Sequence, residues 1–397
     1  MSIIKKENFY KTLEEEQRIL SCYTKLTFKR NNSLFYSQLE SQDNKNKQTV
    51  SVSLFPSYLS PDFTSKKNTT IIKVPQKKIH GFAIMLKKNI EIVDFLKLNY
   101  KKKFIQNTTR YLNRFQNCLS PVYKLYFGEI RHDEYNYLMS KLKKMIETRF
   151  SQRGVVSQNI QSWEYYLKRS YDLIKSKRAS LFVIYVNKDP VQITLNHHFK
   201  KKLFVTITSF DIKYSKFSLG NISIYKTLEW CLKNEYDLLD MAYGELPYKK
   251  AWSNCIYNFE HHILYQKNNI KSLLKAKIEQ GILTIKNNLK AFNLDYYFDK
   301  RYKKNKNPYV KCNNYITSLE PQFLLTNEFK LTEFRNEKYT CIKEEILNFL
   351  YTSKEKLAKL KIYKNKAETN YLVIGNTGIK KICIQCKNID KKNCPYK

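Results

Sequence analysis

The order of apolar segments between residues 180 and 243 constrains the fold of this chain more than any other feature. Strand-like segments at 180–187, 191–198 and 203–210 are separated by short polar turns, and a helix-like segment at 221–234 leads to a further strand at 237–243. In the first strand both alternating faces are apolar, so we expect both faces of the sheet to be covered. This order predicts an α+β protein in which helices flank a mixed central sheet.

Residues 218–252 carry the clearest functional chemistry in the sequence. Gly220 opens the helix, and the strand after it ends in a loop that carries Tyr248 and Lys249. A helix N-terminus favours anions because its backbone N–H groups are unpaired and the helix dipole is positive there. Ligands of α/β sheets bind beyond strand ends. Together these features predict a pocket for a phosphate-bearing donor and an acceptor, as in a transferase.

The same stretch resembles the GNAT acyltransferase superfamily, from about residue 81 to residue 266. The closest likeness is to the CelD-like (cellulose-biosynthesis-type) branch, which is related to the Fem aminoacyl transferases. The residues that carry the resemblance, in order, are Ser218, Leu219, Gly220, Asp240, Gly244, Tyr248, Lys249 and Trp252. Leu219 is a departure, since the branch usually has proline at this position.

The resemblance implies a GNAT-like mixed central sheet flanked by helices, in a tandem arrangement of two halves followed by a C-terminal extension. Residues 1–122 would be a degenerate first half that ends in a basic helix at 91–117, and residues 123–268 the acyltransferase domain. Residues 269–397 would form a basic helical linker and an extension without an assigned role. Within the first half the pattern predicts a helix at 13–26 and strands near 50–55, 70–74 and 81–86.

The resemblance also implies a place for acetyl-coenzyme A. In GNAT folds the sheet opens between the fourth and fifth strands, here 203–210 and 237–243, and the acyl donor lies in the gap. The residues implied in donor binding are Val205, Ile207 and Ser209 for the pantetheine arm, Ser218, Gly220 and Asn221 for the pyrophosphate, and Lys249 for a phosphate or an acceptor carboxylate. The usual phosphate loop, Q/R-x-x-G-x-G/A, is reduced to a single glycine, which leaves open a donor other than coenzyme A.

Acyl transfer needs a base for the attacking amine or hydroxyl, hydrogen-bond donors for the oxyanion, and an acid for the leaving group. By position, Tyr248 resembles the GNAT acid, and Asp240 is expected to line the cleft or hold the neighbouring loop. His198 and Glu245 are the candidate bases, although His197, His261 and His262 lie in similar histidine pairs. For each of these residues a purely structural role is the alternative.

The formal net charge of +37 suggests an anionic partner such as tRNA or another anionic polymer, with Lys97, Arg110, Arg114 and residues 101–103 on the basic helix. A lysine-rich, solvated surface is the alternative, because Lys, Asn, Ile, Tyr and Phe are all over-used and share A/T-rich codons. Nine cysteines without framework spacing, no apolar leader and no apolar run long enough for a bilayer predict a cytoplasmic protein. Cys383, Cys386 and Cys394 offer three thiols where zinc takes four ligands, so no metal is expected.

We therefore expect transfer of an acetyl group from acetyl-coenzyme A to an amine or hydroxyl, on a small molecule or a cell-envelope glycan. Two alternatives stay open: aminoacyl transfer from a charged tRNA, as in the Fem proteins, and an inactive GNAT-like module that binds a polyanion.

Overall fold

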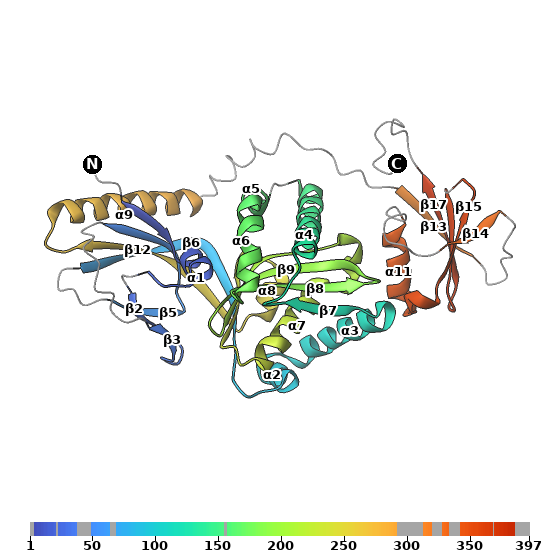
Figure 1. The fold of residues 1–397 in the computed structure, drawn as a ribbon, viewed down its shortest axis with the longest axis horizontal. Helices are drawn as coiled ribbons and strands as arrows, with labels where there is room; N and C mark the ends of the chain where they lie inside the picture. Colours follow the sequence, from blue (N-terminus) through green and yellow to red (C-terminus); the bar gives the residue numbers. More distant parts are fainter. Residues whose placement is uncertain are drawn as a thin grey trace.

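The fold is known from a computed structural model, which describes residues 4–20, 23–37, 49–63, 69–154, 157–291, 313–319, 328–332, 342–367 and 369–385. Its centre is a nine-stranded mixed sheet flanked by helices (Figure 1), as the apolar pattern predicts. The strand order is β1 (Lys5–Asn8), β4 (Val50–Pro56), β12 (Cys255–Gln266), β6 (Thr69–Met85), β11 (Leu238–Tyr243), β10 (Lys202–Phe210), β9 (Asp189–Phe199), β8 (Ala179–Val186) and β7 (Val122–Tyr126). Only two neighbouring pairs, β1 with β4 and β10 with β11, run parallel.

Helices cover both faces of this sheet because its strands are apolar on both faces. Helices α4 (His132–Arg153) and α6 (Trp163–Lys175), with the short α5 (Gln158–Gln161) before α6, lie on one face and pack on Leu181 and Val183. Helices α2 (Ile92–Asn99), α3 (Lys102–Leu119) and α7 (Leu219–Lys233) lie on the other face. There Phe182 and Ile184, the alternate residues of β8, pack against α3 and α7. The two-sided burial predicted for this strand is confirmed.

The N-terminal segment contributes directly to the central sheet. The strands predicted near 70–74 and 81–86 are parts of one strand, β6, which lies between β11 and β12 and pairs antiparallel with both. The strand predicted near 50–55 is β4, which pairs with β12. Strands from either side of the predicted boundary at residue 122 thus share one sheet. A small sheet formed by β3 (Leu34–Ser37), β2 (Tyr23–Phe28) and β5 (Leu59–Phe63) packs beside it.

Two helices differ from the sequence prediction. The helix expected at 13–26 is instead α1 (Phe9–Glu15), which stops because Gln17 takes a left-handed conformation (φ 56°), and Tyr23 already belongs to a strand. The helix expected at 91–117 is divided into α2 and α3 at Tyr100, whose backbone is extended. The break allows the Tyr100 hydroxyl to donate to the Trp252 carbonyl oxygen (2.5 Å) and its ring to stack on Phe104. Packing against the core therefore overrides the continuous helical pattern.

The C-terminal part contains two separate units. Helix α9 (Ile270–Ala291) lies on β6 and β12 at one end of the central sheet (Figure 1). The second unit, here called the C-terminal module, is a five-stranded antiparallel sheet with helix α11 (Lys343–Ser353). Its strands, in sheet order, are β13 (Asn313–Leu319), β17 (Ile379–Gln385), β16 (Asn370–Ile374), β15 (Lys361–Asn365) and β14 (Phe329–Thr332).

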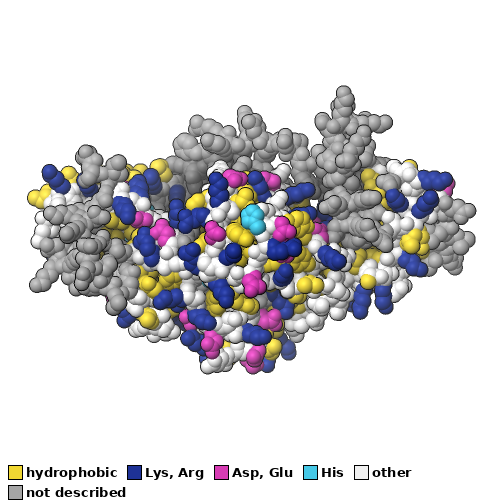
Figure 2. Space-filling model, viewed as in Figure 1, with side chains coloured by type: hydrophobic (Ala, Val, Ile, Leu, Met, Phe, Trp, Pro, Cys, Tyr) yellow, Lys and Arg dark blue, Asp and Glu magenta, His cyan; other side chains and the backbone are white. Residues whose placement is uncertain are grey.

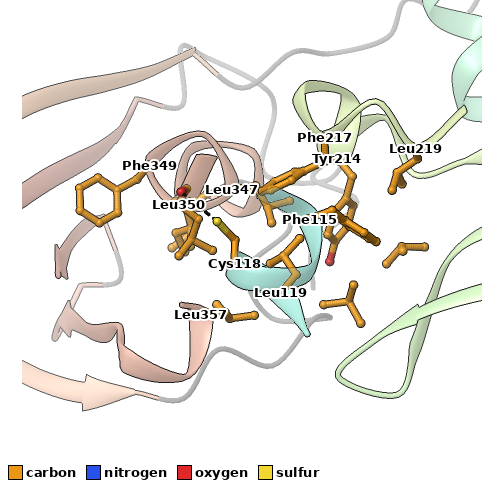
Figure 3. Close-up of a cluster of buried hydrophobic side chains, with 14 of the residues drawn as sticks. Phe115, Cys118, Leu119, Tyr214, Phe217, Leu219, Leu347, Phe349, Leu350 and Leu357 are labelled. Carbon is orange, nitrogen blue, oxygen red and sulfur yellow. Dashed lines mark hydrogen bonds between the residues drawn. The ribbon is translucent and has the colours of Figure 1, made fainter. Parts of the chain in front are cut away.

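The C-terminal module docks on α3 and on the 3₁₀ helix η1 (Ile212–Phe217) through one hydrophobic cluster (Figure 3). In this cluster Phe115 and Phe217 face Leu347 and Leu350, and the Cys118 thiol donates to the Leu350 carbonyl oxygen (3.4 Å). The contact is also polar, since buried Lys343 lies 3.1 Å from Asp211 and 3.6 Å from Asp189. The module therefore packs on the core through a specific interface.

The basic charge is distributed widely. Lys and Arg side chains cover much of the face seen in Figure 2, with fewer acidic side chains among them. On the predicted basic helix, residues 101–103 are exposed at the start of α3. Arg114, in contrast, donates to the Tyr351 carbonyl oxygen and lies over the ring of the same residue. Of the predicted basic residues, Lys97, Arg110 and residues 101–103 are thus exposed, whereas Arg114 is partly buried.

In the described part of the chain no helix is long and apolar enough to cross a membrane. Cys383 lies in β17, while Cys386 and Cys394 are outside the described residues. Among the residues that are described, no group of three His, Cys, Asp or Glu side chains is placed to hold a metal ion.

Candidate active site

Strands β10 and β11 stop pairing with each other in the middle of the sheet. They pair over only three positions, ending at Phe204 opposite Asp240, although both strands continue beyond that point. On the other side of β10 the register with β9 shifts between Val205 and Ile207, which is a β-bulge. The bulge thus lies at the place where the gap is expected. The sheet therefore opens toward the C-terminal ends of these two parallel strands.

This opening leads into a cleft of about 850 Å³. Its walls come from β10 and β11, from α4 to α6, from helix α1 and from α8 (Pro247–Trp252), a short helix where the sequence analysis expected a loop. The side chains in these walls that carry polar or aromatic groups include Tyr10, Lys11, Glu14, Arg149, Tyr165, Tyr166, Thr206, Thr208, Tyr243, Tyr248 and Lys249. The cleft is wide enough for an extended ligand and contains hydroxyl, amine and carboxylate groups together.

Lys249 is the most perturbed cationic group in the cleft wall. Its ammonium donates to the backbone carbonyl oxygens of Met241 (2.6 Å) and Tyr243 (2.8 Å), and the residue is only 9% exposed. Burial lowers the pKa of Lys249 from 10.5 to about 8, against the opposing charge of Asp240. Left-handed backbone at Gly244 (φ 106°), which favours glycine, forms the turn after β11 that brings α8 back over the strand end. The pKa of this lysine at the edge of the cleft is therefore closer to neutral pH than that of an exposed lysine.

Asp240 lies behind the cleft wall and is fully buried. Its carboxylate accepts hydrogen bonds from the hydroxyls of Tyr10 (2.9 Å), Tyr58 (2.9 Å) and Tyr257 (2.8 Å), and from the backbone N–H of Ala242 (2.8 Å). Burial raises its pKa from 3.8 to about 6, although these hydrogen bonds favour the charged form. Asp240 is absent from the cleft lining, so its link to the cleft runs through Tyr10, which does line it.

Tyr248 lines the cleft from α8, as the resemblance implies for a catalytic acid. Its ring faces the first turn of α7, where a Cβ added to Gly220 would lie 4.0 Å from Cδ1 of Tyr248. Asn221 in the same turn accepts a hydrogen bond from the indole nitrogen of Trp252 (2.9 Å). Helix α8 thus packs directly against the N-terminal turn of α7.

This packing separates the residues implied in donor binding. Val205 lines the cleft, whereas Ile207 and Ser209 are buried within the sheet and do not. Ser218, Gly220 and Asn221, at the start of α7, are also absent from the lining. The strand implied in pantetheine binding therefore borders the cleft, but the three positions implied in pyrophosphate binding do not open into it.

Neither candidate base lies in the cleft. Both ring nitrogens of His198 are hydrogen-bonded in the core, to Tyr236 (2.8 Å) and Ser180 (2.7 Å), and burial together with the neighbouring His197 lowers its pKa to about 3. Glu245 is exposed in the turn before α8, and its carboxylate lies 4.0 Å from Nε2 of His80. The structure therefore places His198 in the core, with both ring nitrogens engaged, and not in the lining of the cleft.

The sequence analysis missed a polar group on the opposite wall. Nδ1 of His197 lies 2.6 Å from the Thr206 hydroxyl and 3.3 Å from a carboxylate oxygen of Glu14. Thr206 and Glu14 line the cleft, and His197 is buried behind them. Strand alternation indicates that His197 and His198 face opposite ways, but it does not reveal which faces the cleft. Nothing in the sequence connects Glu14, in α1, with β9.

Residues 103–250 match the family model described as the acetyltransferase (GNAT) domain. This part of the chain is therefore similar to GNAT acetyltransferase domains. It runs from α3 to α8 and thus includes the diverging strands β10 and β11 together with Tyr248 and Lys249. The residues of α1 and β6 that complete the cleft and its supports lie outside it. No curated protein matches the sequence.

Solved structures show a distant likeness. A conserved protein of unknown function from Bacteroides thetaiotaomicron is 13% identical, with 56% of this chain and 71% of that chain covered and a TM-score of 0.38. FemX is 9% identical, with 53% and 71% covered and a TM-score of 0.38. A tandem GNAT protein from the clavulanic acid biosynthesis pathway is 8% identical, with 59% and 75% covered and a TM-score of 0.29.

Proposed function

We propose that this protein transfers an acyl group, with acetyl from acetyl-coenzyme A as the first candidate, to an amine or hydroxyl acceptor in the cleft between β10 and β11. The observation that carries the proposal is the parting of these strands at Phe204 and Asp240, with Tyr248 and Lys249 on the wall of the opening. The spacing of Asp240, Gly244, Tyr248 and Lys249 supports a CelD-like enzyme. The acceptor would be a small molecule or a cell-envelope glycan.

Lys249 is suited to act as the general base. In its neutral form the amine has two hydrogens, which the carbonyl oxygens of Met241 and Tyr243 can both accept, and a lone pair that remains available. A pKa of about 8 gives a useful neutral fraction near neutral pH. Lys249 would take the proton from the acceptor's amine or hydroxyl while the nitrogen or oxygen of that acceptor bonds to the acyl carbon.

Tyr248 is suited to act as the general acid. As the tetrahedral intermediate collapses, the bond from the acyl carbon to the leaving group breaks and the leaving group takes the phenolic proton. Lys249 then releases its proton to solvent and the phenolate takes one up from solvent, so both residues return to their starting protonation state after each turnover. Both residues come from one turn of α8 and face the same cleft.

A bound acyl-coenzyme A would supply the activated acyl group on a thiol leaving group. The cleft and the exposed edge of β10 at Val205 fit its extended arm. The start of α7 fits its pyrophosphate less well, because α8 packs against that turn through Tyr248 and the Trp252–Asn221 hydrogen bond. This packing, together with the net charge of +37, favours aminoacyl transfer from a charged tRNA as the second candidate.

The four cysteines in the described residues, Cys118, Cys231, Cys255 and Cys383, are all free thiols. Free thiols in a chain with nine cysteines fit a reducing compartment. We therefore place the reaction in the cytoplasm.

The experiment that tests the proposal combines donor binding with one substitution. Calorimetry with acetyl-coenzyme A, longer acyl-coenzyme A esters and charged tRNA identifies the donor class. Tyr248→Phe should keep the melting temperature and the donor affinity while turnover falls by about 10²–10⁴, the usual effect of losing a positioned acid. Tyr243→Phe is the matched control, because Tyr243 also lines the cleft and is half exposed.

A Tyr248→Phe protein that melts early but turns over normally when folded would make the phenol a structural brace. A folded protein that binds none of the donors but still binds a polyanion would instead be an inactive GNAT-like module.

A further inference from the structure

Helix α9 is attached to the rest of the molecule along one side only. Its inward side chains Ser272, Ala276 and Glu279 are buried against β6 and β12. Ser272 is hydrogen-bonded to Thr49 (3.0 Å), and Glu279 accepts from Ser51 (3.0 Å). These contacts fix the rotation of the helix about its axis, and so they determine which side chains face outward.

The outward side of α9 is unusually apolar. Of the fifteen large apolar side chains that are exposed in the described residues, seven belong to this one helix. They are Ile270, Leu273, Leu274, Ile278, Ile282, Ile285 and Leu289. Most are three or four residues apart, so they form one continuous stripe opposite the buried side. Isolated exposed leucines need no explanation, whereas a stripe of this kind indicates an interaction surface.

Helix α9 also carries positive charge. The lysines of α9 are Lys271, Lys275, Lys277, Lys286 and Lys290. The one acidic residue of the helix, Glu279, is only 5% exposed and faces the sheet. The exposed part of α9 thus combines apolar and cationic groups without any acidic group. Along the upper-left edge of Figure 2, where Figure 1 places α9, hydrophobic and basic side chains lie next to one another.

We propose that α9 binds the surface of an anionic lipid bilayer and lies parallel to the membrane plane. At 1.5 Å per residue its 22 residues form a rod of about 33 Å. The aliphatic stripe would enter the boundary between headgroups and acyl chains, and the lysines would contact lipid phosphates. Because its inner side stays on the sheet, α9 attaches the whole protein to the surface without crossing the bilayer.

Charge decides against the main alternative occupant, a second copy of the same chain. Pairing two copies of this surface would bring two sets of lysines together with no exposed acidic residue on either helix to offset them. An anionic bilayer offers complementary charge and an apolar interior at once. The proposal concerns α9 alone, so it holds or fails independently of the reaction in the cleft.

The test is co-sedimentation of the full chain with vesicles, either of phosphatidylcholine alone or of phosphatidylcholine with phosphatidylglycerol. The wild-type protein should bind the vesicles with phosphatidylglycerol at least tenfold more tightly than those of phosphatidylcholine alone. Added salt should weaken binding to the anionic vesicles. A variant with Leu274→Gln, Ile278→Gln and Ile285→Gln should lose at least tenfold in affinity for the anionic vesicles. Circular dichroism would verify that it is folded.

The matched control replaces three other exposed apolar residues, Leu98→Gln, Val122→Gln and Leu331→Gln, which are 68%, 61% and 65% exposed on other elements. This control should bind anionic vesicles like the wild type. Equal binding by the α9 variant and the wild type, or equal loss in the control, would overturn the proposal. So would a wild-type dimer in light scattering that the α9 substitutions convert to a monomer, since the stripe would then be a self-association surface.

Discussion

The buried carboxylate of Asp240 should make the stability of this protein depend on pH in a predictable direction. Its folded-state pKa of about 6 lies above its ordinary value of 3.8, because burial outweighs four hydrogen bonds. A carboxyl group of this kind favours the folded state when protonated. Its contribution is therefore fully present below pH 3.8 and is lost as the pH rises through about 6. The usual carboxylate in an ion pair behaves in the opposite way.

The magnitude follows from the same two values. Each pKa unit corresponds to about 1.4 kcal/mol, so the whole effect is about 3 kcal/mol, of which about 2 kcal/mol falls between pH 4.5 and pH 7.5. In Asp240→Asn the group cannot titrate, and one acceptor oxygen facing three tyrosine hydroxyls becomes a donor. At pH 4.5 we expect the variant to be about 1–3 kcal/mol less stable than the wild type. By pH 7.5 this gap should narrow by about 2 kcal/mol.

Urea unfolding followed by tryptophan fluorescence measures the gap, since the three tryptophans, Trp163, Trp230 and Trp252, belong to elements packed on the central sheet. Other titrating groups cancel in the difference between variant and wild type. Glu245→Gln, whose side chain is 74% exposed, is the control and should change stability by less than about 0.5 kcal/mol at either pH. A difference in stability between variant and wild type that stays constant, or that widens toward pH 7.5, would refute the assignment of Asp240 as a buried acid with a raised pKa.

Three further predictions concern lysines in different environments. If Lys249 is the base, kcat/KM should rise with pH through about 8, and Lys249→Met should abolish that limb of the profile; an unchanged profile would assign the base elsewhere. Lys343→Met leaves Asp189 and Asp211 without their shared cation, so the C-terminal module should loosen by about 2–3 kcal/mol. In Lys343→Met, amide hydrogen exchange in α11 should become faster while exchange in the central sheet stays unchanged. Unchanged exchange in α11 would contradict the predicted loosening. Changing exposed residues 101–103 to glutamine should flatten the plot of log affinity for tRNA against log salt concentration. The slope should fall by about one unit for each phosphate that these lysines neutralise. An unchanged slope would mean that these lysines are solvated and do not contact tRNA.

The part of the fold that the sequence predicts well is the part governed by local pattern. The strands β8, β9 and β10 and the helix α7 lie within a few residues of their predicted positions. Their boundaries are marked by polar turns, and their faces by alternation, so few long-range contacts are needed to define them. The gap between β10 and β11 follows from the resemblance, and a β-bulge that no local pattern reveals lies beside it.

The part that the sequence does not predict depends on contacts between distant segments. Tyr10 and Glu14 reach the cleft from α1, more than 180 residues before the strands that they approach. The choice between His197 and His198 depends on which face of β9 meets α1. Likewise, whether the start of α7 can bind a pyrophosphate depends on how closely α8 packs against it. Each of these questions is decided by tertiary packing, and a single sequence carries no direct signal for it.

The N-terminal segment therefore helps to form the candidate site even though the match to the GNAT domain begins at residue 103. Strand β6 pairs with β11 along the part of β11 that contains Asp240. Within β6, Gly81 leaves space for the ring of Tyr257, because a Cβ at this position would overlap that ring. The Tyr257 hydroxyl then reaches Asp240. The backbone N–H of Ala242 is held by the same carboxylate, just before the turn that positions Lys249. A glycine in the N-terminal segment is thus connected, through one tyrosine and one buried aspartate, to the strand end whose carbonyl oxygens accept from the proposed base.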